Sequence, residues 1–337
     1  MSDLDRFWRE SPPRTSRRGN FWIPGEPVRV DGEVYQHGPM FVAWEAPTAP
    51  AEKLPVVLVH GGATQATEWL ETPDGRPGWA QRLVEAGYPV FVVDRPTQGR
   101  SPYHPSVDGP MGPAFSYDEG QLVFFPEALQ DRHTQWPFDV GDDRAMGAFI
   151  AQFGPLPADL AESQRMDADR IADLLDMIGS AVVVTHSASG PDGWLVADRR
   201  PGHVAAIVTV EPMGPAFASV PNIGTLEWGL TAAPLRYDPP LPTSGAARAA
   251  DPATLRVPAL EGIPVAVVVG GASPFAKNGP RIVESLLVAG ASAELVDLEA
   301  HGVHGNGHGL IYERNSDEAL APVLAWMEAS VRVEEHA

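Results

Sequence analysis

The sequence predicts an α/β protein built on a mostly parallel, doubly wound sheet. Short apolar runs rich in β-branched residues recur along the chain, each bounded by Gly, Pro or Asp, as expected of parallel strands buried on both faces. Segments of helical character alternate with these runs, and the alternation is typical of βαβ units. The 337 residues suffice for one large α/β domain with insertions, or for two small domains.

The elements follow one another in a regular order. The spacing of apolar residues between Phe21 and Trp44 predicts short antiparallel strands at the sheet edge. Buried strands are expected to begin at Pro55, Pro89, Val182, Val204, Pro264 and Ala293. Helices are expected over Gly78–Ala86, Ala168–Ile178, Gly193–Arg199, Pro280–Ala289 and Asp317–Ser330.

Three segments lie outside this alternation. Residues 1–20 mix Pro, Ser and charge and are expected to form an N-terminal arm. Residues 102–157 are rich in aromatics, and residues 214–262 are rich in Pro and Ala. Structureless loops of that length are uncommon unless they are functional, so we expect both to be cap or lid insertions over the site. The core then consists of residues 21–101, 158–213 and 263–337.

Composition excludes several classes of function. The chain has 24 Lys and Arg against 44 Asp and Glu, and its net charge of −20 would repel nucleic acid. The absence of cysteine excludes disulfides, thiolate metal sites and a Cys nucleophile. The first 20 residues lack the apolar stretch of a signal peptide, and no long apolar span follows. We therefore expect a cytoplasmic protein without a membrane segment, and leave a homodimer open.

The stretch VVVTHSASG is the strongest chemical signal in the chain. An apolar run that ends in small residues around a serine is typical of the nucleophile elbow, usually written G-x-S-x-G. Here Thr185 and Ser189 take the two glycine positions around Ser187. Ser187 could instead be an ordinary serine that caps a helix. Ser189 also fits the spacing, but its hydroxyl is expected to turn into the helix, so Ser187 is the predicted nucleophile.

A serine hydroxyl needs a base within hydrogen-bond reach, and in this chain order the base is a later histidine. His203 begins a strand, so it lies at the wrong edge of the sheet. His301, His304 and His308 lie in HGVHGNGH, before the last helix. The Gly-Asn-Gly before His308 allows a loop that aims its imidazole over the sheet, so His308 is the predicted base. His301 and His304 are expected to line the pocket or lie on the surface.

The three clustered histidines suggest a metal site as an alternative. The segment lacks the H-E-x-x-H pattern, and its glycines prevent a shared helical face. We therefore expect no metal and no cofactor.

The acid of the triad is predicted from the ends of strands. The loop after the strand that begins at Pro264 is the usual place, but its sequence GGASPF has no carboxylate. Glu211 ends the run VAAIVTV, where a carboxylate is costly to bury without a partner, and an imidazolium is a suitable one. Glu211 is the predicted acid, with Asp94 and Asp297 as the next candidates. Asp94 could instead be a structural turn residue.

The tetrahedral intermediate of acyl transfer requires two backbone N–H donors. One is expected to be the amide of Ala188, directly after the nucleophile. The other is expected in the HGG loop after the first long strand, at Gly62, because glycine lets the backbone approach the substrate.

Taken together, the elbow, the HGG loop, DRPTQGRS and the late GNGH resemble the α/β-hydrolase superfamily over about residues 55 to 330. Further details are similar to the branch of bacterial esterases typified by esterase 713: a TPDGRPGW segment, a serine preceded by Thr-His, a Glu after the following strand, and a G-N-x-H histidine. Those features correspond to Ser187, Glu211 and His308. The resemblance implies esterase activity and names no natural substrate.

We therefore expect a serine hydrolase that cleaves a small-molecule carboxylic ester or lactone through an acyl-enzyme, using a Ser-His-Glu triad. Two other interpretations stay open. The same triad could act on a carbon–carbon, carbamate or amide bond, because one scaffold hosts many chemistries. Alternatively, the protein could be catalytically silent and retain only the ligand pocket.

Overall fold

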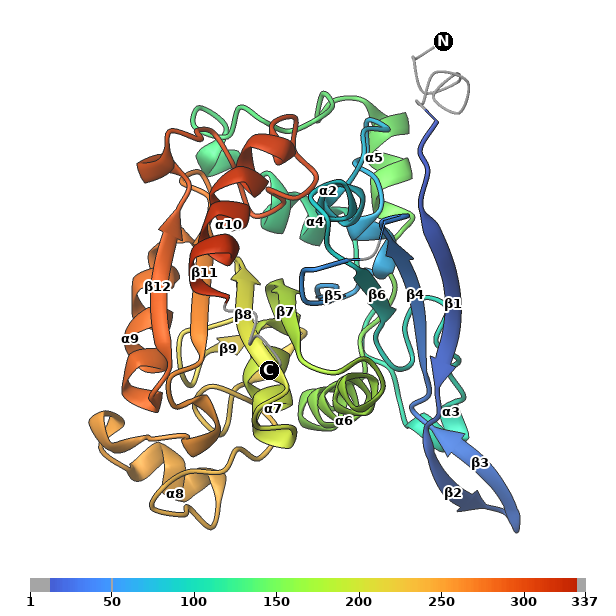
Figure 1. Ribbon diagram of the computed structural model, residues 1–337, viewed down its shortest axis with the longest axis vertical. Helices are drawn as coiled ribbons and strands as arrows, with labels where there is room; N and C mark the ends of the chain where they lie inside the picture. The colour runs from blue at the N-terminus through green and yellow to red at the C-terminus, as the bar shows by residue number, and fades with distance from the viewer. Residues whose placement is uncertain (1–12, 50, 332–337) are drawn as a thin grey trace.

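The structure, a computed structural model, describes residues 13–49 and 51–331 and is organised around an eight-stranded sheet (Figure 1). In sheet order the strands are β1 (Arg17–Ile23), β4 (Met40–Ala46), β6 (Val90–Asp94), β5 (Val56–Val59), β7 (Ala181–His186), β8 (Val204–Val210), β11 (Pro264–Val269) and β12 (Ser292–Asp297). The strands from β6 to β12 are parallel, and β4 is antiparallel to both of its neighbours. The predicted α/β fold class is confirmed.

Helices cover both faces of this sheet. Five of the helices correspond to the predicted ones: α2 (Trp79–Glu85), α6 (Leu160–Ile178), α7 (Gly190–Arg199), α9 (Gly279–Ala289) and α10 (Ser316–Ser330). Short 3₁₀ turns occur at η2 (Ala66–Trp69), η3 (Glu127–Leu129), η4 (Ser187–Ser189), η5 (Pro252–Thr254), η6 (Pro258–Leu260), η7 (Ala276–Asn278) and η8 (Glu299–His301). All five predicted helices are present. α6 begins before the predicted Ala168, because the Asp159 side chain accepts from the Glu162 amide and caps an earlier turn.

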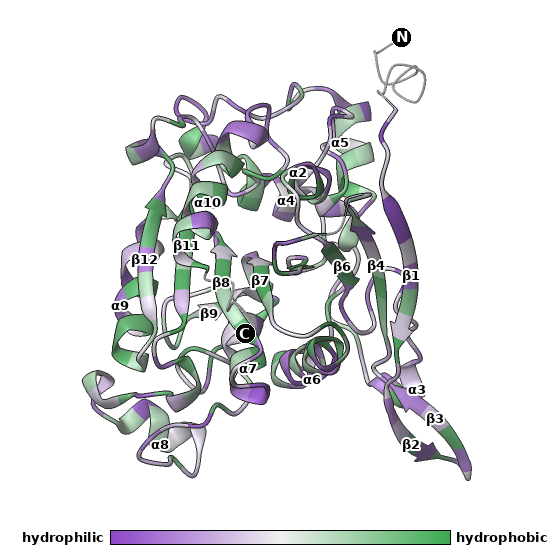
Figure 2. Ribbon diagram, viewed as in Figure 1, coloured by the Kyte–Doolittle hydropathy of each residue, from purple (hydrophilic) through white to green (hydrophobic). Residues whose placement is uncertain are grey.

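The buried strands supply two apolar layers by simple alternation. Val56 and Leu58 of β5 face the layer that contains α2 and α10, whereas Val57 and Val59 face the layer that contains α6, α7 and α9. Figure 2 shows the apolar colouring concentrated on the central strands. Both faces of these strands are therefore covered, which is the reason their sequences are continuously apolar rather than alternating.

The N-terminal strands divide into two groups. β1 and β4 form the predicted antiparallel edge. β2 (Glu26–Val30) and β3 (Glu33–His37) instead pair only with each other, which corrects the expectation that they belong to the sheet edge. β3 is exposed at most of its positions, so it has no apolar face to bury. Residues 1–12 of the predicted arm lie outside the described residues, and β1 already begins at Arg17.

The first insertion, residues 102–157, owes its aromatic content to a small core of its own. It contains α3 (Pro105–Asp108), α4 (Tyr117–Phe124) and α5 (Asp143–Ile150). Phe124 and Trp136 pack edge-on against Phe149, with ring centroids 5.2 and 5.0 Å apart respectively. Phe149 in turn contacts Tyr312, which lies just before α10. This insertion is therefore joined to the main core by ring packing.

The second insertion, residues 214–262, divides between two ends of the sheet. Its small sheet of β9 (Ser219–Val220) and β10 (Gly224–Thr225) precedes α8 (Ser244–Ala249). In Figure 1, α8 lies at the opposite end of the strands from α4 and α5, which lie where the arrows of β8 and β12 point. Leu235 and Val257 pack in the same apolar layer as α7 and α9. Much of this segment therefore packs beside the core.

The contact between α7 and the end of β8 provides a test of this packing. A Cβ added at Gly190 would lie 2.5 Å from Pro212 Cβ and 3.0 Å from its Cα. Because the contact includes backbone, we expect Gly190→Ala to lower the free energy of unfolding by about 1–3 kcal/mol, measured by urea denaturation. The matched control is Gly245→Ala in α8, where the nearest atom is 3.7 Å away and helix propensity favours alanine. Equal stability of the two variants would contradict this prediction.

Candidate active site

Ser187 stands on a sharp turn between β7 and α7. Its φ is +55°, a left-handed conformation that non-glycine residues rarely adopt, and one expected of the strained turn at a nucleophile elbow. Gly190 allows α7 to approach Pro212 closely, and Gly193 lies against Ile207 of β8 in the same way. The turn is therefore fixed by the close packing of α7 on the neighbouring strand.

Ser189 occupies one of the two positions where the elbow pattern has glycine, and its hydroxyl is already engaged. Ser189 Oγ lies 3.1 Å from the Val59 carbonyl and 2.9 Å from the His186 carbonyl, and it accepts from the His186 amide at 3.1 Å. Its side chain is fully buried. At the other position, the Thr185 hydroxyl donates to Thr209 at 3.0 Å. Both hydroxyls hold the turn, and Ser189 does not point at the triad.

Three of the predicted residues meet beyond the carboxyl ends of the strands. His308 Nε2 lies 2.9 Å from Ser187 Oγ, and His308 Nδ1 lies 3.3 Å from Glu211 Oε2. The residues come from three separate segments: the end of β7, the end of β8 and the loop before α10. This geometry places a hydroxyl, an imidazole and a carboxylate in contact one after the other, an arrangement that is suited to acyl transfer.

Glu211 is held by the loop that follows β11, in which the sequence has no carboxylate. Glu211 Oε1 accepts from the Gly270 amide at 2.6 Å, and Oε2 accepts from the Ser273 hydroxyl at 2.5 Å. Its backbone also has a positive φ, +50°. The loop after β11 therefore supplies donors to a carboxylate that the preceding strand carries. Ser273 was not predicted, because a serine in GGASPF has no distinguishing feature in sequence.

His308 is 2% exposed, and its surroundings favour the neutral ring. Burial is the main cause that lowers the pKa of His308 below its ordinary value; the nearby His186 lowers it further, whereas Glu211 opposes the shift. The ring of Phe275 packs edge-on against it, with centroids 4.8 Å apart. A neutral imidazole at neutral pH is the form that can accept a proton from a hydroxyl.

The three other histidines considered as the base lie away from this arrangement. His301 and His304 are exposed, so they lie on the surface. His301 Nδ1 bonds the Asp297 carbonyl at 2.9 Å, and His304 Nδ1 is 3.9 Å from a Glu299 carboxylate oxygen. His203 precedes β8 at its amino end, the edge opposite the triad.

The two alternative carboxylates serve local turns. Asp94 Oδ1 accepts from the Ala66 amide at 2.7 Å, and its Oδ2 accepts from the Arg100 amide at 2.9 Å. Asp297 Oδ1 accepts from the Glu299 amide at 3.0 Å. Both carboxylates end their strands: Asp94 joins the turn after β6 to the segment at Ala66, and Asp297 holds the turn after β12.

The HGG loop lies beside the elbow. A Cβ added at Gly61 would be 3.2 Å from Ser187 Cβ, and one added at Gly62 would be 3.0 Å from Ala188 Cβ. His60 shapes this loop: its Nε2 accepts from the Arg95 amide at 2.9 Å, and its Nδ1 lies 2.9 Å from the Gly61 carbonyl. Burial lowers the pKa of His60 to about 4, which keeps the ring neutral. Glycine at positions 61 and 62 allows the backbone of the HGG loop to lie close to Ser187 and Ala188.

A second carboxylate–histidine pair, missed by the sequence analysis, lies directly behind the triad. His186 Nδ1 is 3.3 Å from Glu68 Oε1, and the His186 ring stacks on that of His308 with centroids 5.1 Å apart. Glu68 also accepts from the Gly61 amide at 2.9 Å and from the Tyr312 hydroxyl at 3.2 Å. Glu68 thereby joins the HGG loop, the elbow and the segment before α10. The glutamate in HGGATQATEW was the only sequence signal for it.

The two members of this pair stabilise each other's charge. Burial raises the pKa of Glu68, but the charge of His186 and its hydrogen bond outweigh burial, so that the pKa lies below its ordinary value. Burial likewise lowers the pKa of His186, but Glu68 outweighs it and raises the pKa. Each member of the pair therefore favours the charged form of the other, beneath Ser187, His308 and Glu211.

The loop that carries His308 is fixed by a third buried carboxylate. Glu313 accepts from the Asn306 side chain at 2.7 Å and from the Gly307 amide at 2.8 Å. Its Oε1 also lies 2.7 Å from His133 Nε2, which belongs to the first insertion. The polar residue in Gly-Asn-Gly thus has a structural role that the sequence did not indicate.

The part of the chain that the structure describes contains neither a grouping of metal ligands nor a helix that could span a membrane. Within residues 13–49 and 51–331, no three His, Cys, Asp or Glu side chains are grouped as they would be around a metal ion. In the same residues, no helix combines the length and the apolar character needed to cross a membrane.

Comparison with known proteins gave one sequence relative and a similar fold. No family model matches the chain. A curated protein described as a probable secreted lipase, phiG, from Fungal sp. (strain ATCC 74256), is 34% identical over 324 residues, which cover 88% of each chain. The solved structure of a novel bacterial esterase has a TM-score of 0.73 at 24% identity, covering 96% of this chain and 98% of its own. The structural likeness shows the fold, and the sequence relative shows the family.

The buried Glu68–His186 pair gives a prediction about stability. Glu68→Gln leaves His186 without a charged partner, so we expect the free energy of unfolding to fall by about 3 kcal/mol. Folding lowers the pKa of Glu68 and raises that of His186, so the loss is largest between their ordinary values of 4.5 and 6.5. This loss in stability becomes smaller as the pH falls through the folded-state pKa of Glu68, or rises through the folded-state pKa of His186. Urea unfolding of both proteins at several pH values measures the loss.

The matched control is Glu85→Gln, which removes a carboxylate from a solvent-exposed pair with Arg82. Exposed pairs contribute at most about 1 kcal/mol, so this variant should unfold nearly as the wild type does. A loss in Glu68→Gln that is as small as the loss in the control would contradict an ionised buried pair.

Proposed function

The chain belongs to the α/β-hydrolase superfamily of esterases and lipases, and on this premise we propose that it cleaves a carboxylic ester or lactone through an acyl-enzyme on Ser187. The family makes the chain a carboxylic ester hydrolase. The roles of individual residues are our proposal: Ser187 is the nucleophile, His308 the general base and Glu211 the carboxylate that orients the base.

The reaction proceeds in two acyl transfers. Ser187 Oγ attacks the ester carbonyl carbon while its proton moves to His308 Nε2. The carbon–oxygen bond to the alcohol then breaks, and His308 gives the proton to the leaving oxygen. A water molecule next attacks the acyl-enzyme, and its proton passes through His308 back to Ser187 as the acid leaves. Glu211 holds the Nδ1–H of the ring throughout and stabilises the imidazolium.

The negative charge of each tetrahedral intermediate requires fixed donors. We assign these to the backbone amides of Gly62 and Ala188, whose Cα positions bring a Cβ at residue 62 within 3.0 Å of Ala188 Cβ. The hydrogen bond from the Gly61 amide to Glu68 supports this role, because it fixes the loop in advance of the reaction. Donors that are already oriented need no reorganisation when the charge develops.

The observation that carries the proposal is the continuous contact from Ser187 Oγ through His308 to Glu211, at 2.9 and 3.3 Å. The lowered pKa of His308 supports it, because the ring is neutral in the range where it must accept a proton. The expected cytoplasmic location, the cap role of the insertions and the homodimer stay predictions.

The nucleophile is tested by replacing each serine of the elbow in turn. We expect Ser187→Ala to abolish ester hydrolysis, with a loss in kcat on the order of 10⁶, and to leave thermal unfolding unchanged. A fluorophosphonate probe should label the wild type at Ser187 and fail to label the variant, as shown by peptide mass spectrometry. Ser189→Ala is the matched control and should still be labelled. If labelling were lost only in Ser189→Ala, the nucleophile would be Ser189 and not Ser187.

The acid is tested by Glu211→Gln. We expect kcat to fall by roughly 10² to 10⁴, because the amide cannot stabilise the imidazolium and favours the wrong tautomer. In the wild type, the rate should fall as the pH drops through the pKa of His308, which lies below its ordinary 6.5. Since Glu211 raises that pKa, its removal should shift the acid limb to still lower pH.

The control for this experiment is Glu299→Gln, which alters an exposed carboxylate near His304. It should keep the wild-type kcat and pH profile. A Glu211→Gln enzyme with a wild-type kcat would show that the acid lies elsewhere.

A further inference from the structure

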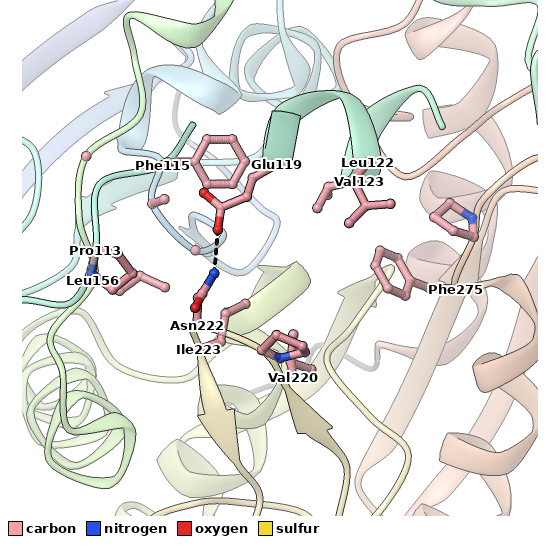
Figure 3. A pocket seen from close by; sticks show the side chains of 15 residues that line it. Pro113, Phe115, Glu119, Leu122, Val123, Leu156, Val220, Asn222, Ile223 and Phe275 are labelled. Carbon is pink, nitrogen blue, oxygen red and sulfur yellow. Dashed lines mark hydrogen bonds between the residues drawn. The ribbon is translucent and has the colours of Figure 1, made fainter. Parts of the chain in front are cut away.

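A pocket of about 350 Å³ lies between the two insertions and the HGG loop (Figure 3). Nearly all of its lining is apolar, and the side chains converge from several segments of the chain. The main apolar contributors are Phe115, Leu122, Val123, Leu156, Ile223 and Phe275. Figure 3 shows the side chains of α4 on one side of the pocket and those near β9 and β10 on the other.

We propose that this pocket binds an uncharged apolar group of the ester, of medium length, directly beside the reacting carbonyl. The proposal rests on the proposed function, because it names the substrate class of the same site. An apolar group gains free energy when it leaves water for such a lining, and a group of that kind leaves no polar atom unpaired.

The pocket adjoins the proposed reaction centre on two sides. Gly62, to which we assign an oxyanion donor, lines it. Phe275 also lines it, and its ring packs against His308 with centroids 4.8 Å apart. Leu156, which also lines the pocket, lies 3.3 Å from the position of a Cβ added at Gly62. A group in the pocket is therefore attached to a carbonyl that Ser187 can reach.

The volume sets the size of the group. A water molecule in the liquid occupies about 30 Å³, so the pocket holds on the order of ten non-hydrogen atoms. That is the size of a medium alkyl chain or a substituted phenyl ring. A long fatty chain would have to leave the pocket, and an acetyl group would leave most of it empty.

The charge of the pocket excludes anionic groups. Among the described residues that line the pocket, Glu119 is the one charged residue and none is a cation. Its carboxylate accepts from the Ser116 amide at 2.8 Å and from the Asn222 side chain at 2.6 Å. The hydrogen bond from the Ser116 backbone is the main cause that lowers the pKa of Glu119 below its ordinary value. A carboxylate on the substrate would meet the like charge of Glu119 at the wall of the pocket.

The same hydrogen bond joins the two insertions across the pocket. Glu119 belongs to α4 of the first insertion, and Asn222 lies between β9 and β10 of the second. Asn222 has a positive φ of +61°, which a turn asparagine tolerates. The contact fixes the width of the pocket, so the volume available to the substrate is defined by both insertions.

The first experiment measures kcat/KM for two series of esters. One series lengthens the acyl chain of p-nitrophenyl esters from acetate to dodecanoate, and the other lengthens the alcohol of alkyl acetates. We expect kcat/KM to rise roughly fourfold per methylene in one of the two series and to level off near eight to ten carbons. The series that responds identifies which part of the ester enters the pocket. A flat profile in both series would overturn the proposal.

The second experiment changes the pocket itself. Leu156→Trp should lower the ratio of kcat/KM for long chains to kcat/KM for short chains at least tenfold. Leu156→Ala should move the chain length at which kcat/KM levels off to longer chains. The matched controls are Leu287→Trp and Leu287→Ala, at an exposed position on α9, and they should keep the wild-type profile. If both Leu156 variants kept the wild-type profile, the apolar group would bind elsewhere.

The charge is tested with p-nitrophenyl esters whose acyl chain ends in a carboxylate. The wild type should discriminate against them by at least tenfold relative to the uncharged ester of equal length, and Glu119→Gln should reduce that discrimination. Equal discrimination in the two proteins would contradict the role of Glu119.

Binding without turnover separates this proposal from the proposed function. The Ser187→Ala protein should bind methyl octanoate in calorimetry, and Ser187→Ala combined with Leu156→Trp should bind it at least tenfold more weakly. Binding that depends on Leu156 would support the pocket even if the wild type failed to hydrolyse every ester. If the wild type hydrolyses esters but the single and the double variant bind methyl octanoate equally well, the proposal about the pocket is overturned and the proposed function is not.

Discussion

The lateral pairing of four parallel strands is the constraint on which the rest of the site depends. Val59 of β5 pairs with Thr185 of β7, and His186 pairs with Val210 of β8. Val210 pairs in turn with Val268 of β11. Backbone hydrogen bonds therefore bring the strand ends to one level, and the residue after each end enters the same crevice. The HGG loop, Ser187 and Glu211 all owe their proximity to this register, because they directly follow paired residues.

Buried charges then hold the loops that emerge from this edge. Glu68 joins the HGG loop to the elbow, and Glu313 fixes the segment that carries His308. Each carboxylate accepts several hydrogen bonds and lies near a histidine, which offsets the cost of taking a charge out of water. These buried carboxylates thus hold the glycine-rich loops that carry Gly61, Gly62 and His308 in place. The proposed pocket depends on the same contacts, because Gly62 of the HGG loop is one of its lining residues.

The carboxylate of Glu211 is held by hydrogen bonds from a different loop. The loop after β11 has no carboxylate, and instead its Gly270 amide and Ser273 hydroxyl donate to Glu211 from the neighbouring strand. The elbow shows a similar substitution, since Ser189 stands where the pattern has glycine and its hydroxyl bonds the turn. In both cases the residue that departs from the expected type is held by hydrogen bonds with a neighbouring strand or loop.

The sequence by itself determined the buried strands and the five helices that cover the main sheet, because hydrophobic periodicity and turn residues act locally. The apolar run before Ser187 and the one before Glu211 each identified a strand end from a few neighbouring residues. Only the tertiary structure decided that Glu68 pairs with His186, that Glu313 holds Asn306, and that Asn222 bonds Glu119. Those contacts join segments far apart in the chain, and no local pattern records which buried partner a charged side chain will meet.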